Sequence, residues 1–349
     1  TPDIYYIILD SYAREDVLAQ LYGLDNSGFL ASLQARGFYI AAESHSNYFH
    51  TPSSLASSLN MDYLYVENSE RASFGALGDL VRGNRVRAAL DEQGYSFVTV
   101  ESGFAVSRFS NADVYLTAVP NPFLNQFEGL LLISSALVIP VDKGWMTVPV
   151  VGRGANFVQV RYALEQLAEV PAIPGPKFVF FHIISPHPPF LVDRYGNYVE
   201  PYSPYAGDLD GDVLQIPQEV YIDGYNEKLI YTNRMLLAAV DAILENSTTP
   251  PVIILQADHG PGLLWSRSSL EATCVWERAA ILNAYYLPED GASQLYPGIT
   301  PVNSFRVIFD TYFGTDLGFL EDRVYYSTWN RPYQFIDVTE RTSHPCGVP

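Results

Sequence analysis

The sequence predicts an α/β protein with a doubly wound, mostly parallel central sheet flanked by helices. Short apolar runs rich in β-branched and aromatic residues alternate with longer segments in which apolar residues recur at helical spacing. Polar residues follow directly after several of these runs, and ligands of open α/β sheets bind at that position. We expect one domain over residues 1–349, because a single sheet accommodates that length and no low-complexity linker or repeat divides the chain.

The strands are predicted from continuous apolar runs, which are typical of strands buried on both faces. They lie at residues 4–9, 38–42, 95–100, 177–184 and 251–256. The helices are predicted from the spacing of apolar residues, with Gly37 as a stop signal after the first. They lie at residues 15–36, 79–93, 155–169 and 226–245.

A further helix is expected to open at Thr51-Pro52-Ser53-Ser54. A threonine or serine can cap a helix, and proline fits the first helical turn.

Two segments stand apart from the alternation. Residues 196–224 are rich in Gly, Pro, Tyr and Asp, which predicts a long surface excursion that could act as a lid. Residues 129–140 are strongly apolar, but a run of about 12 residues is too short to span a bilayer.

The chain starts at Thr1 in a strand-like run, and we interpret it as an excised or processed domain that could have followed a membrane anchor.

The formal net charge is −19, and no run of Lys or Arg occurs in the sequence. This charge argues against nucleic acid as a partner, because binding to a phosphate backbone needs a basic surface. An acidic protein that handles an anionic substrate needs local positive charge, and a bound metal ion is the simplest source.

Two cysteines are present, Cys274 and Cys346, without the spacing of a structural zinc site. A disulfide between them would suit an exterior compartment, and two buried free thiols fit the sequence equally well.

Four side chains that can bind metal or phosphate follow strand ends: Asp10, His187, Asp258 and His259. They are expected to meet at one edge of the sheet. The string Asp258-His259-Gly260 is the most specific of these signals, because two adjacent ligands followed by glycine after a buried strand are hard to explain by packing.

Together with Thr51, and in the same order along the chain, these residues resemble the alkaline phosphatase and sulfatase superfamily. The resemblance covers most of the chain. The pattern is closest to the catalytic domains of lipoteichoic acid synthases and phosphoethanolamine transferases, where Thr51-Pro52-Ser53-Ser54 matches the Thr-x-x-Ser nucleophile turn. The resemblance implies that Asp10, Thr51, Asp258 and His259 share one metal ion and that Thr51 is the nucleophile.

Each of these implied roles has a physical reason. A threonine hydroxyl is a weak nucleophile, and coordination to a divalent cation lowers its pKa. Two carboxylates and one imidazole suit zinc or manganese, while magnesium and calcium remain alternatives. The structural alternative for Thr51 is an ordinary helix cap, and that for Asp10 is a loop cap.

The six histidines differ in their signals. His187 lies in a Pro-rich loop after a strand, where it resembles a phosphate ligand or the acid for the leaving group. His182 lies inside an apolar run and is interpreted as a core histidine. His50 is interpreted as a solvated loop residue, and His45 and His344 carry no signal.

The sequence also departs from parts of the superfamily. Formylglycine sulfatases need Cys or Ser in a turn that also carries Arg, and here the turn holds Thr without a following Arg. Ser11 follows Asp10 where many sulfatases have a second Asp. With so few histidines, one tight metal ion is expected, and any second site should be weak.

An acidic run imitates part of a calcium loop through Asp208, Asp210, Asp212 and Glu219. Val213 stands where the loop needs Gly, so the run is interpreted as solvated. Asn246-Ser247-Thr248 is a glycosylation sequon, which has meaning only in a eukaryotic secretory setting.

We therefore expect metal-dependent transfer or hydrolysis of a phosphodiester head group through a covalent intermediate on Thr51. The alternatives are a phosphodiesterase, phosphomonoesterase or sulfuric ester hydrolase of the same fold, and a catalytically silent sulfatase-like binding domain. The expected substrate is a phosphorylated lipid or sugar head group. The expected location is extracytoplasmic, with contact to a membrane surface through an anchor outside this chain.

Overall fold

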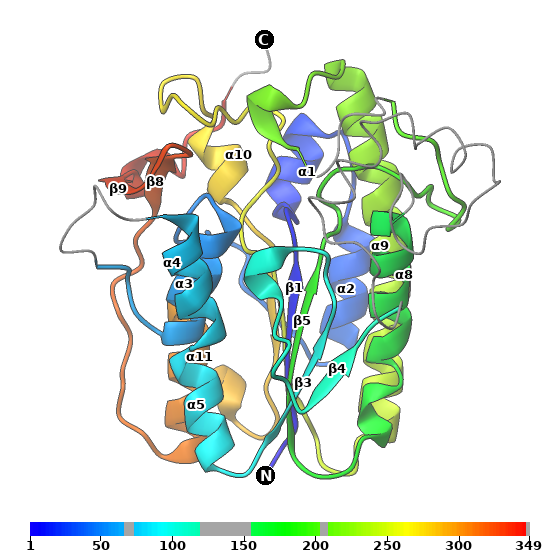
Figure 1. Ribbon diagram of the computed structural model, residues 1–349, viewed down its shortest axis with the longest axis vertical. Helices are drawn as coiled ribbons and strands as arrows, with labels where there is room; N and C mark the ends of the chain where they lie inside the picture. Colours follow the sequence, from blue (N-terminus) through cyan, green and yellow to red (C-terminus); the bar gives the residue numbers. More distant parts are fainter. Residues whose placement is uncertain (66–72, 119–154, 203–208, 347–349) are drawn as a thin grey trace.

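The computed structural model describes residues 1–65, 73–118, 155–202 and 209–346. A seven-stranded sheet stands between two layers of helices (Figure 1). The strand order is β2-β7-β6-β1-β5-β3-β4, and a separate two-stranded sheet is formed by β8 and β9. The predicted α/β class with a mostly parallel, helix-flanked sheet is confirmed.

Strands β6, β1, β5, β3 and β4 run parallel, while β7 pairs antiparallel with β6 and with β2. The five predicted strands are all present, and β4, β7, β8 and β9 are additional. The strands of the large sheet are β1 Ile4–Leu9, β2 Tyr39–Ile40, β3 Ser96–Val100, β4 Val114–Leu116, β5 Lys177–Ile183, β6 Val252–Gln256 and β7 Asn283–Tyr286; the small sheet has β8 Tyr325–Thr328 and β9 Arg331–Asp337.

Helices cover both faces of the large sheet. In the view of Figure 1, α3, α4, α5 and α11 lie on the left face, and α1, α2, α8 and α9 lie on the right face. Their bounds are α1 Glu15–Leu21, α2 Ser27–Ala35, α3 Thr51–Asn60, α4 Phe74–Arg82, α5 Arg85–Glu92, α8 Ala155–Leu167, α9 Gln218–Asn246, α10 Val275–Ala279 and α11 Pro301–Phe313.

Two helices predicted as continuous are divided in the structure. The segment 15–36 forms α1 and α2, which are separated at Gly23, a residue with a positive φ of 61° that few other residues adopt at low cost. The segment 79–93 divides at Gly83-Asn84 between α4 and α5, where the Asn84 side chain caps α5 by accepting from the Arg87 N–H. The helical spacing of apolar residues continues across both breaks. A prediction based on that spacing therefore could not detect them.

The predicted surface excursion at 196–224 is partly wrong. Residues 218–224 belong to α9, which begins at Gln218 rather than at 226. The described remainder contains a single 3₁₀ turn, Gly211–Val213. Its use as a lid stays a prediction. The apolar segment 129–140 and Asp208 lie outside the described residues.

Side chains of the central strands alternate between two cores. Tyr5, Ile7 and Leu9 of β1 pack into the core formed with α1, α2, α8 and α9. Ile4, Tyr6 and Ile8 face the opposite core, formed with α3, α5 and α11. Both sets are at most 1% exposed, which explains why β1 reads as an unbroken apolar run. Each such side chain contributes about 1.5–3 kcal/mol through burial, so β1 is a rigid support for the residue that follows it.

Cys274 and Cys346 form a disulfide, with Cα atoms 5.8 Å apart. The sequence left this pairing open. The bond joins the start of α10 to the described end of the chain, after β9. Within the described ranges, no helix has both the length and the apolar character needed to cross a membrane.

Candidate metal centre and nucleophile

The candidate site forms where three neighbouring parallel strands end. Strand β1 lies between β5 and β6, with Leu9 paired to Ile183 and Ile8 paired to Gln256. The register places Asp10, which follows β1, beside the end of β5 and beside the Asp258-His259 pair that follows β6. This is the edge of the sheet at which the sequence predicted that polar residues would meet.

Three acidic and imidazole groups gather here within a small volume. The potential ligand atoms of Asp10, His182 and Asp258 lie within 4.8 Å of one another, and all three residues are buried. His182 Nε2 lies 3.2 Å from Asp10 Oδ2, and its Nδ1 lies 2.8 Å from Ser107 Oγ. His182 is buried and partnered as predicted, but its assignment to the core alone was wrong, because its ring faces the carboxylates.

His259 joins Thr51, the predicted nucleophile, to the carboxylates. Its Nε2 lies 3.1 Å from Thr51 Oγ1, 3.3 Å from Asp258 Oδ2 and 3.7 Å from Asp10 Oδ1. Nδ1 lies 3.0 Å from the Gly260 carbonyl oxygen. A proton on Nδ1 would satisfy that contact and leave a lone pair on Nε2, which in this structure faces the Arg278 guanidinium (3.2 Å) and is the atom that a bound cation would use. The structure brings together the four residues predicted to share a metal ion.

These residues fit a divalent cation by geometry and by chemistry. Two ligands of a tetrahedral zinc ion, each about 2.0–2.1 Å from the metal, lie roughly 3.3–3.4 Å apart. The distances around His259 Nε2 are close to that value. Asp258 Oδ2 is buried and accepts no hydrogen bond from any described residue. An unpaired buried carboxylate oxygen is costly, and a bound cation would remove that cost.

The electrostatics of the site favour the protonation states that bind metal. Burial acts to raise the pKa of Asp10, but the nearby imidazoles of His187, His182 and His259 outweigh it, and the pKa lies well below its usual range. Burial, followed by the Arg278 charge, lowers the pKa of His259. The site therefore presents a carboxylate and a neutral imidazole at neutral pH, as metal coordination requires.

Thr51 is the first residue of α3, and the helix cap is His50. Thr51 is 7% exposed, and its hydroxyl faces His259 rather than the backbone of its own helix. The alternative, that Thr51 is an ordinary helix cap, is therefore not what the structure has. Its position at the start of a helix places it beside unpaired backbone N–H groups and the positive end of the helix dipole, which attract anions.

His187 reaches the site from the loop after β5. Its backbone N–H donates to the Asp10 carbonyl (3.0 Å), and its ring centroid lies 6.4 Å from that of His259. Its Nε2 lies 4.0 Å from Asp210 Oδ2. Lys228 of α9 holds the loop in place, because its buried ammonium donates to the carbonyl oxygens of Ile184, His187 and Pro189 at 2.6–3.1 Å. No pattern around Lys228 in the sequence predicts that it supports this loop.

Sequence reasoning missed a buried ion pair between Asp210 and Arg278, with Nη1 and Oδ2 2.9 Å apart. Arg278 also donates to the carbonyl oxygens of Gly260 and Phe49, and its Nη2 lies 3.2 Å from His259 Nε2. The interpretation of Asp210 as a solvated acid was wrong, because it is 1% exposed. Burial acts to raise the pKa of Asp210, but His187 and Arg278 outweigh it and lower that pKa.

Asp212 and Glu219 of the same acidic run are exposed, as predicted. No local pattern separates them from Asp210. The burial of Asp210 could have been predicted only from the need of Arg278 for a counter-charge. Arg278 lies far from Asp210 in the sequence.

Gly260 has a steric role in the Asp-His-Gly string. A Cβ at this position would lie 2.1 Å from the Glu277 carbonyl oxygen, so only glycine lets α10 approach the residues that follow β6. That approach brings Arg278 to the site.

His50 is 1% exposed, and its interpretation as a solvated residue was wrong. Its Nε2 lies 3.0 Å from the Ser327 carbonyl oxygen, and its ring contacts Phe74, Trp265 and Trp329. Burial lowers its pKa to about 3, so the ring is neutral.

Comparison with known proteins agrees with this architecture. The family model described as Sulfatase matches residues 2–305, and the chain belongs to the sulfatase family. No match was found among curated proteins.

Among solved structures, the C-terminal periplasmic domain of EptC from Escherichia coli, in complex with Zn, has a TM-score of 0.61 at 13% identity, with coverage of 96% of this chain and 92% of that one. The lipoteichoic acid synthase LtaP from Listeria monocytogenes has a TM-score of 0.51 at 13% identity, with coverage of 91% and 73%. The phosphonate monoester hydrolase of Agrobacterium radiobacter has a TM-score of 0.51 at 12% identity, with coverage of 93% and 80%. At these identities the likeness shows the fold, which is that of alkaline phosphatase-like proteins.

Proposed function

We propose that this chain is a metal-dependent phosphoryl-transfer enzyme that uses Thr51 as its nucleophile and acts on phosphodiester head groups. The observation that carries the proposal is the convergence of the Thr51 hydroxyl, His259 Nε2 and two buried carboxylates at one edge of the sheet. Distances of 3.1–3.7 Å around His259 Nε2 and an unpaired Asp258 oxygen support it.

Asp10, Thr51, Asp258 and His259 are the residues that would hold the ion, with His182 supporting Asp10 from its other side. Zinc or manganese suits this mixture of oxygen and nitrogen ligands best, and magnesium or calcium suits it less because both prefer oxygen ligands. When bound, the ion would supply the positive charge that lowers the pKa of the Thr51 hydroxyl.

In the proposed reaction, the deprotonated Thr51 oxygen attacks phosphorus. A bond from Thr51 Oγ1 to phosphorus forms while the bond from phosphorus to the leaving oxygen breaks. The threonine proton is lost to solvent, and His187 donates a proton to the departing alkoxide. The backbone N–H groups at the start of α3 stabilise the negative charge on the phosphoryl oxygens.

The phosphothreonine is opened in a second step. Water or an alcohol gives a proton to His187 and attacks phosphorus, the bond to Thr51 breaks, and the threonine oxygen is released. Water makes the enzyme a hydrolase, and an alcohol on a lipid or sugar makes it a transferase. Lys228 keeps His187 in place for both steps through the loop carbonyls.

The proposed substrate is a phosphorylated lipid or sugar head group, and the proposed location is the outer face of a membrane. The fold likeness to the periplasmic domain of EptC supports the location. The disulfide between Cys274 and Cys346 supports it too, because such bonds persist outside the reducing cytosol.

The test compares p-nitrophenol release from bis(p-nitrophenyl) phosphate and from p-nitrophenyl sulfate on one sample loaded with zinc or manganese. We expect Thr51→Ala to lower turnover of the phosphodiester by at least about 10³-fold, because the nucleophile is removed. Thr51→Ser keeps a hydroxyl and should retain part of the activity. Intact-mass analysis of a quenched reaction should show a phosphoryl adduct on the wild type and none on Thr51→Ala.

Two results would contradict the proposal. Comparable Thr51-dependent rates on the sulfate would assign the chain to sulfate ester hydrolysis. The absence of any Thr51-dependent release or adduct with either metal would assign it to a silent binding domain.

A further inference from the structure

Arg278 of α10 lies directly against the candidate metal centre. The side chain is 2% exposed, and its guanidinium carbon lies 3.9 Å from the centre of the Trp265 ring. Its Nη2 lies 3.2 Å from His259 Nε2, the atom that a bound ion would use. A permanent positive charge is thus fixed beside the atom that a second positive charge has to approach.

The guanidinium is held by acceptors from separate segments of the chain. Nε and Nη2 both donate to the Phe49 carbonyl oxygen, at 3.2 and 3.0 Å. Nη1 donates to the Gly260 carbonyl oxygen and to Asp210 Oδ2, at 2.9 Å each. These contacts engage four of the five N–H groups that an arginine side chain carries. The fifth belongs to Nη2, and its acceptor is His259 Nε2.

This last contact selects the tautomer of His259. A guanidinium can donate hydrogen bonds but cannot accept them, so the imidazole nitrogen that it faces must carry a lone pair. The ring proton then resides on Nδ1, which lies 3.0 Å from the Gly260 carbonyl oxygen. Arg278 therefore holds His259 in the tautomer that a metal ligand needs.

The same contact also opposes the ion. An ion that takes the Nε2 lone pair removes one hydrogen bond of Arg278, while the bonds to the two carbonyl oxygens and to Asp210 keep the guanidinium in place. The two positive groups then remain neighbours in a buried site. Repulsion between charges in contact is several times larger than the net contribution of one neutral hydrogen bond. Competition for the lone pair therefore outweighs the selection of the tautomer in its effect on metal affinity.

Asp210 reduces this competition. The carboxylate is 1% exposed, with Oδ2 on Arg278 Nη1 and with Oδ1 accepting from the Tyr221 hydroxyl at 2.8 Å. Its negative charge offsets the charge of the guanidinium, so the pair repels an ion less than Arg278 would by itself. The two members of the pair should therefore act on metal affinity in opposite directions.

We propose that the Asp210–Arg278 pair sets the affinity of the candidate centre for its ion. Arg278 presents the lone pair of His259 Nε2 and competes with the ion for it, and Asp210 limits that competition. Both are positioning residues, because they act through His259 and not on the reacting atoms. The proposal rests on the proposed function in one respect, that His259 is a metal ligand, and it requires no substrate.

Zinc affinity is the quantity that tests the pair. The full chain is dialysed against a chelator, and zinc is then titrated in competition with a chromophoric chelator. Arg278→Gln should bind zinc about tenfold more tightly than the wild type, because a competing positive charge is lost. Asp210→Asn should bind zinc about tenfold more weakly, because that charge is no longer offset. Arg278→Lys keeps the charge and should show no gain in affinity.

The signs of these changes separate the proposed role from a merely structural one. If the pair only stabilised the fold around the centre, both single variants would bind zinc more weakly than the wild type. Activity does not make this distinction, because Asp210 Oδ2 also lies 4.0 Å from Nε2 of His187, the proposed proton donor.

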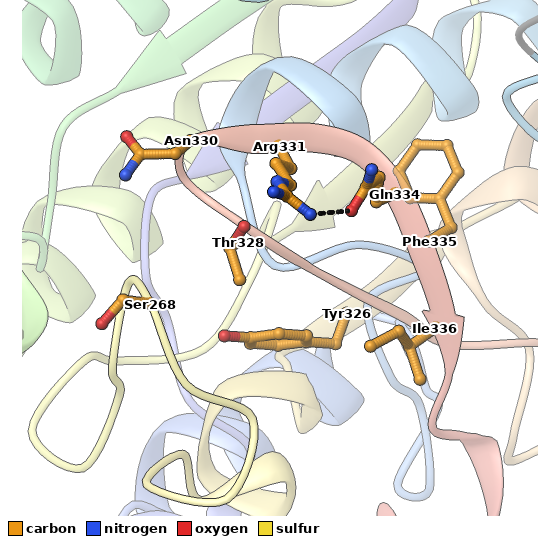
Figure 2. Close-up of a pocket in the computed structure, with 8 residues that line it drawn as sticks. All are labelled: Ser268, Tyr326, Thr328, Asn330, Arg331, Gln334, Phe335 and Ile336. Atoms are coloured by element: carbon orange, nitrogen blue, oxygen red, sulfur yellow. Dashed lines mark hydrogen bonds between the residues drawn. The ribbon is translucent and has the colours of Figure 1, made fainter. Parts of the chain in front are cut away.

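Arg331→Gln is the matched control for the loss of an arginine charge. Figure 2 shows Arg331 in a cavity at the β8–β9 hairpin, where it donates to Gln334 at 3.2 Å. The described residues that line this cavity include none from the candidate metal centre. This variant should bind zinc as the wild type does. An equal gain in Arg331→Gln and Arg278→Gln would assign the effect to the net charge of the chain and overturn the role of the pair.

A double variant keeps the test decisive if Arg278→Gln fails to fold with Asp210 unpaired. Asp210→Asn/Arg278→Gln removes both charges and should bind zinc more tightly than Asp210→Asn does. The proposal is overturned if Arg278→Gln binds zinc no more tightly than the wild type, or if the double variant binds it no more tightly than Asp210→Asn.

The same titrations distinguish this proposal from the proposed function. A wild type that binds neither zinc nor manganese would contradict both. The predicted signs in a protein without Thr51-dependent turnover would support the role of the pair and contradict only the proposed function.

Discussion

The two ends of the central strands carry buried charges that are arranged in opposite ways. At the start of β1 and β5, Asp3 and Lys177 form a close ion pair, with Nζ and Oδ2 2.5 Å apart. At the other end, Asp10 and Asp258 are buried together with imidazoles, and one Asp258 oxygen is unpaired. At the edge with Asp3 and Lys177, the two charges cancel. At the edge with Asp10 and Asp258, the negative charges exceed the positive charges that the described residues supply.

This difference separates a structural charge from a functional one. The Asp3 carboxylate also accepts the Lys177 backbone N–H, so both partners are satisfied and the pair aligns two strands. At the opposite edge, Arg278 is a nearby cation among the described residues, and it is already paired with Asp210. A cation from solution is the simplest partner for the carboxylates that remain.

The largest effect is expected from removing a carboxylate at the unbalanced edge. Asp258→Asn should lower metal affinity by roughly 10³-fold or more and abolish turnover, because a charged ligand is replaced by a weak neutral one. Elemental analysis after dialysis, together with the phosphodiesterase assay, measures both quantities. Asp3→Asn is the matched control at the other edge and should keep the metal. Full metal content in Asp258→Asn would place the ion elsewhere.

The next effect tests the balanced edge by leaving a buried carboxylate without its partner. Lys177→Met should lower the free energy of unfolding by about 3 kcal/mol, because Asp3 loses its counter-charge in a largely buried position. Urea unfolding followed by circular dichroism measures the change. Activity per folded molecule should stay near the wild-type value, and a loss of metal from this variant would show that the two edges are not independent.

A smaller effect is expected at His187. His187→Ala should lower turnover about 10²-fold and leave the metal content unchanged, because this ring is proposed to transfer protons rather than to hold the ion. A substrate with a good leaving group, such as p-nitrophenyl ester, should be less affected in the first step than an alkyl ester, which needs the acid more. Parallel loss of metal and activity would make His187 a ligand.

The smallest effect concerns a third carboxyl group near the unbalanced edge. Glu277 is fully buried, and burial raises its pKa to about 7, while hydrogen bonds from Tyr22 and the Leu264 N–H act in the opposite direction. The folded protein therefore keeps this proton up to about pH 7, and the unfolded chain loses it near its ordinary value of 4.5. Between those values the folded state binds more protons, so stability falls as the pH rises from about 4.5 to 7.

Glu277→Gln should remove this decrease in stability with rising pH. At equal metal loading, the variant should be more stable than the wild type above pH 7 by up to about 2 kcal/mol. Urea midpoints of both proteins at pH 5 and pH 8 measure the difference. An equal pH dependence of stability in the two proteins would show that Glu277 does not hold its proton in the folded state.

The sequence alone determined five of the strands, the mostly parallel character of the sheet and the principal residues at its edge. Runs such as 4–9 and 251–256 are continuous because strands covered on both faces need apolar side chains at every position. A polar residue directly after such a run must lie at the strand's end. This local rule identified Asp10, Asp258 and His259, and Thr51 was recognised from the turn that surrounds it.

The tertiary structure alone decided which distant residues complete the site. Arg278 and Asp210 are 68 positions apart in the chain, and neither shows its buried partner in its own neighbourhood. The apolar run around His182 does not show which way its ring faces. His50 becomes buried only when Trp265 and Trp329 pack on it. The pairing of Cys274 with Cys346 depends on the same long-range packing. Periodicity reports which side of an element is buried, but the partner on that side is set by how the elements pack.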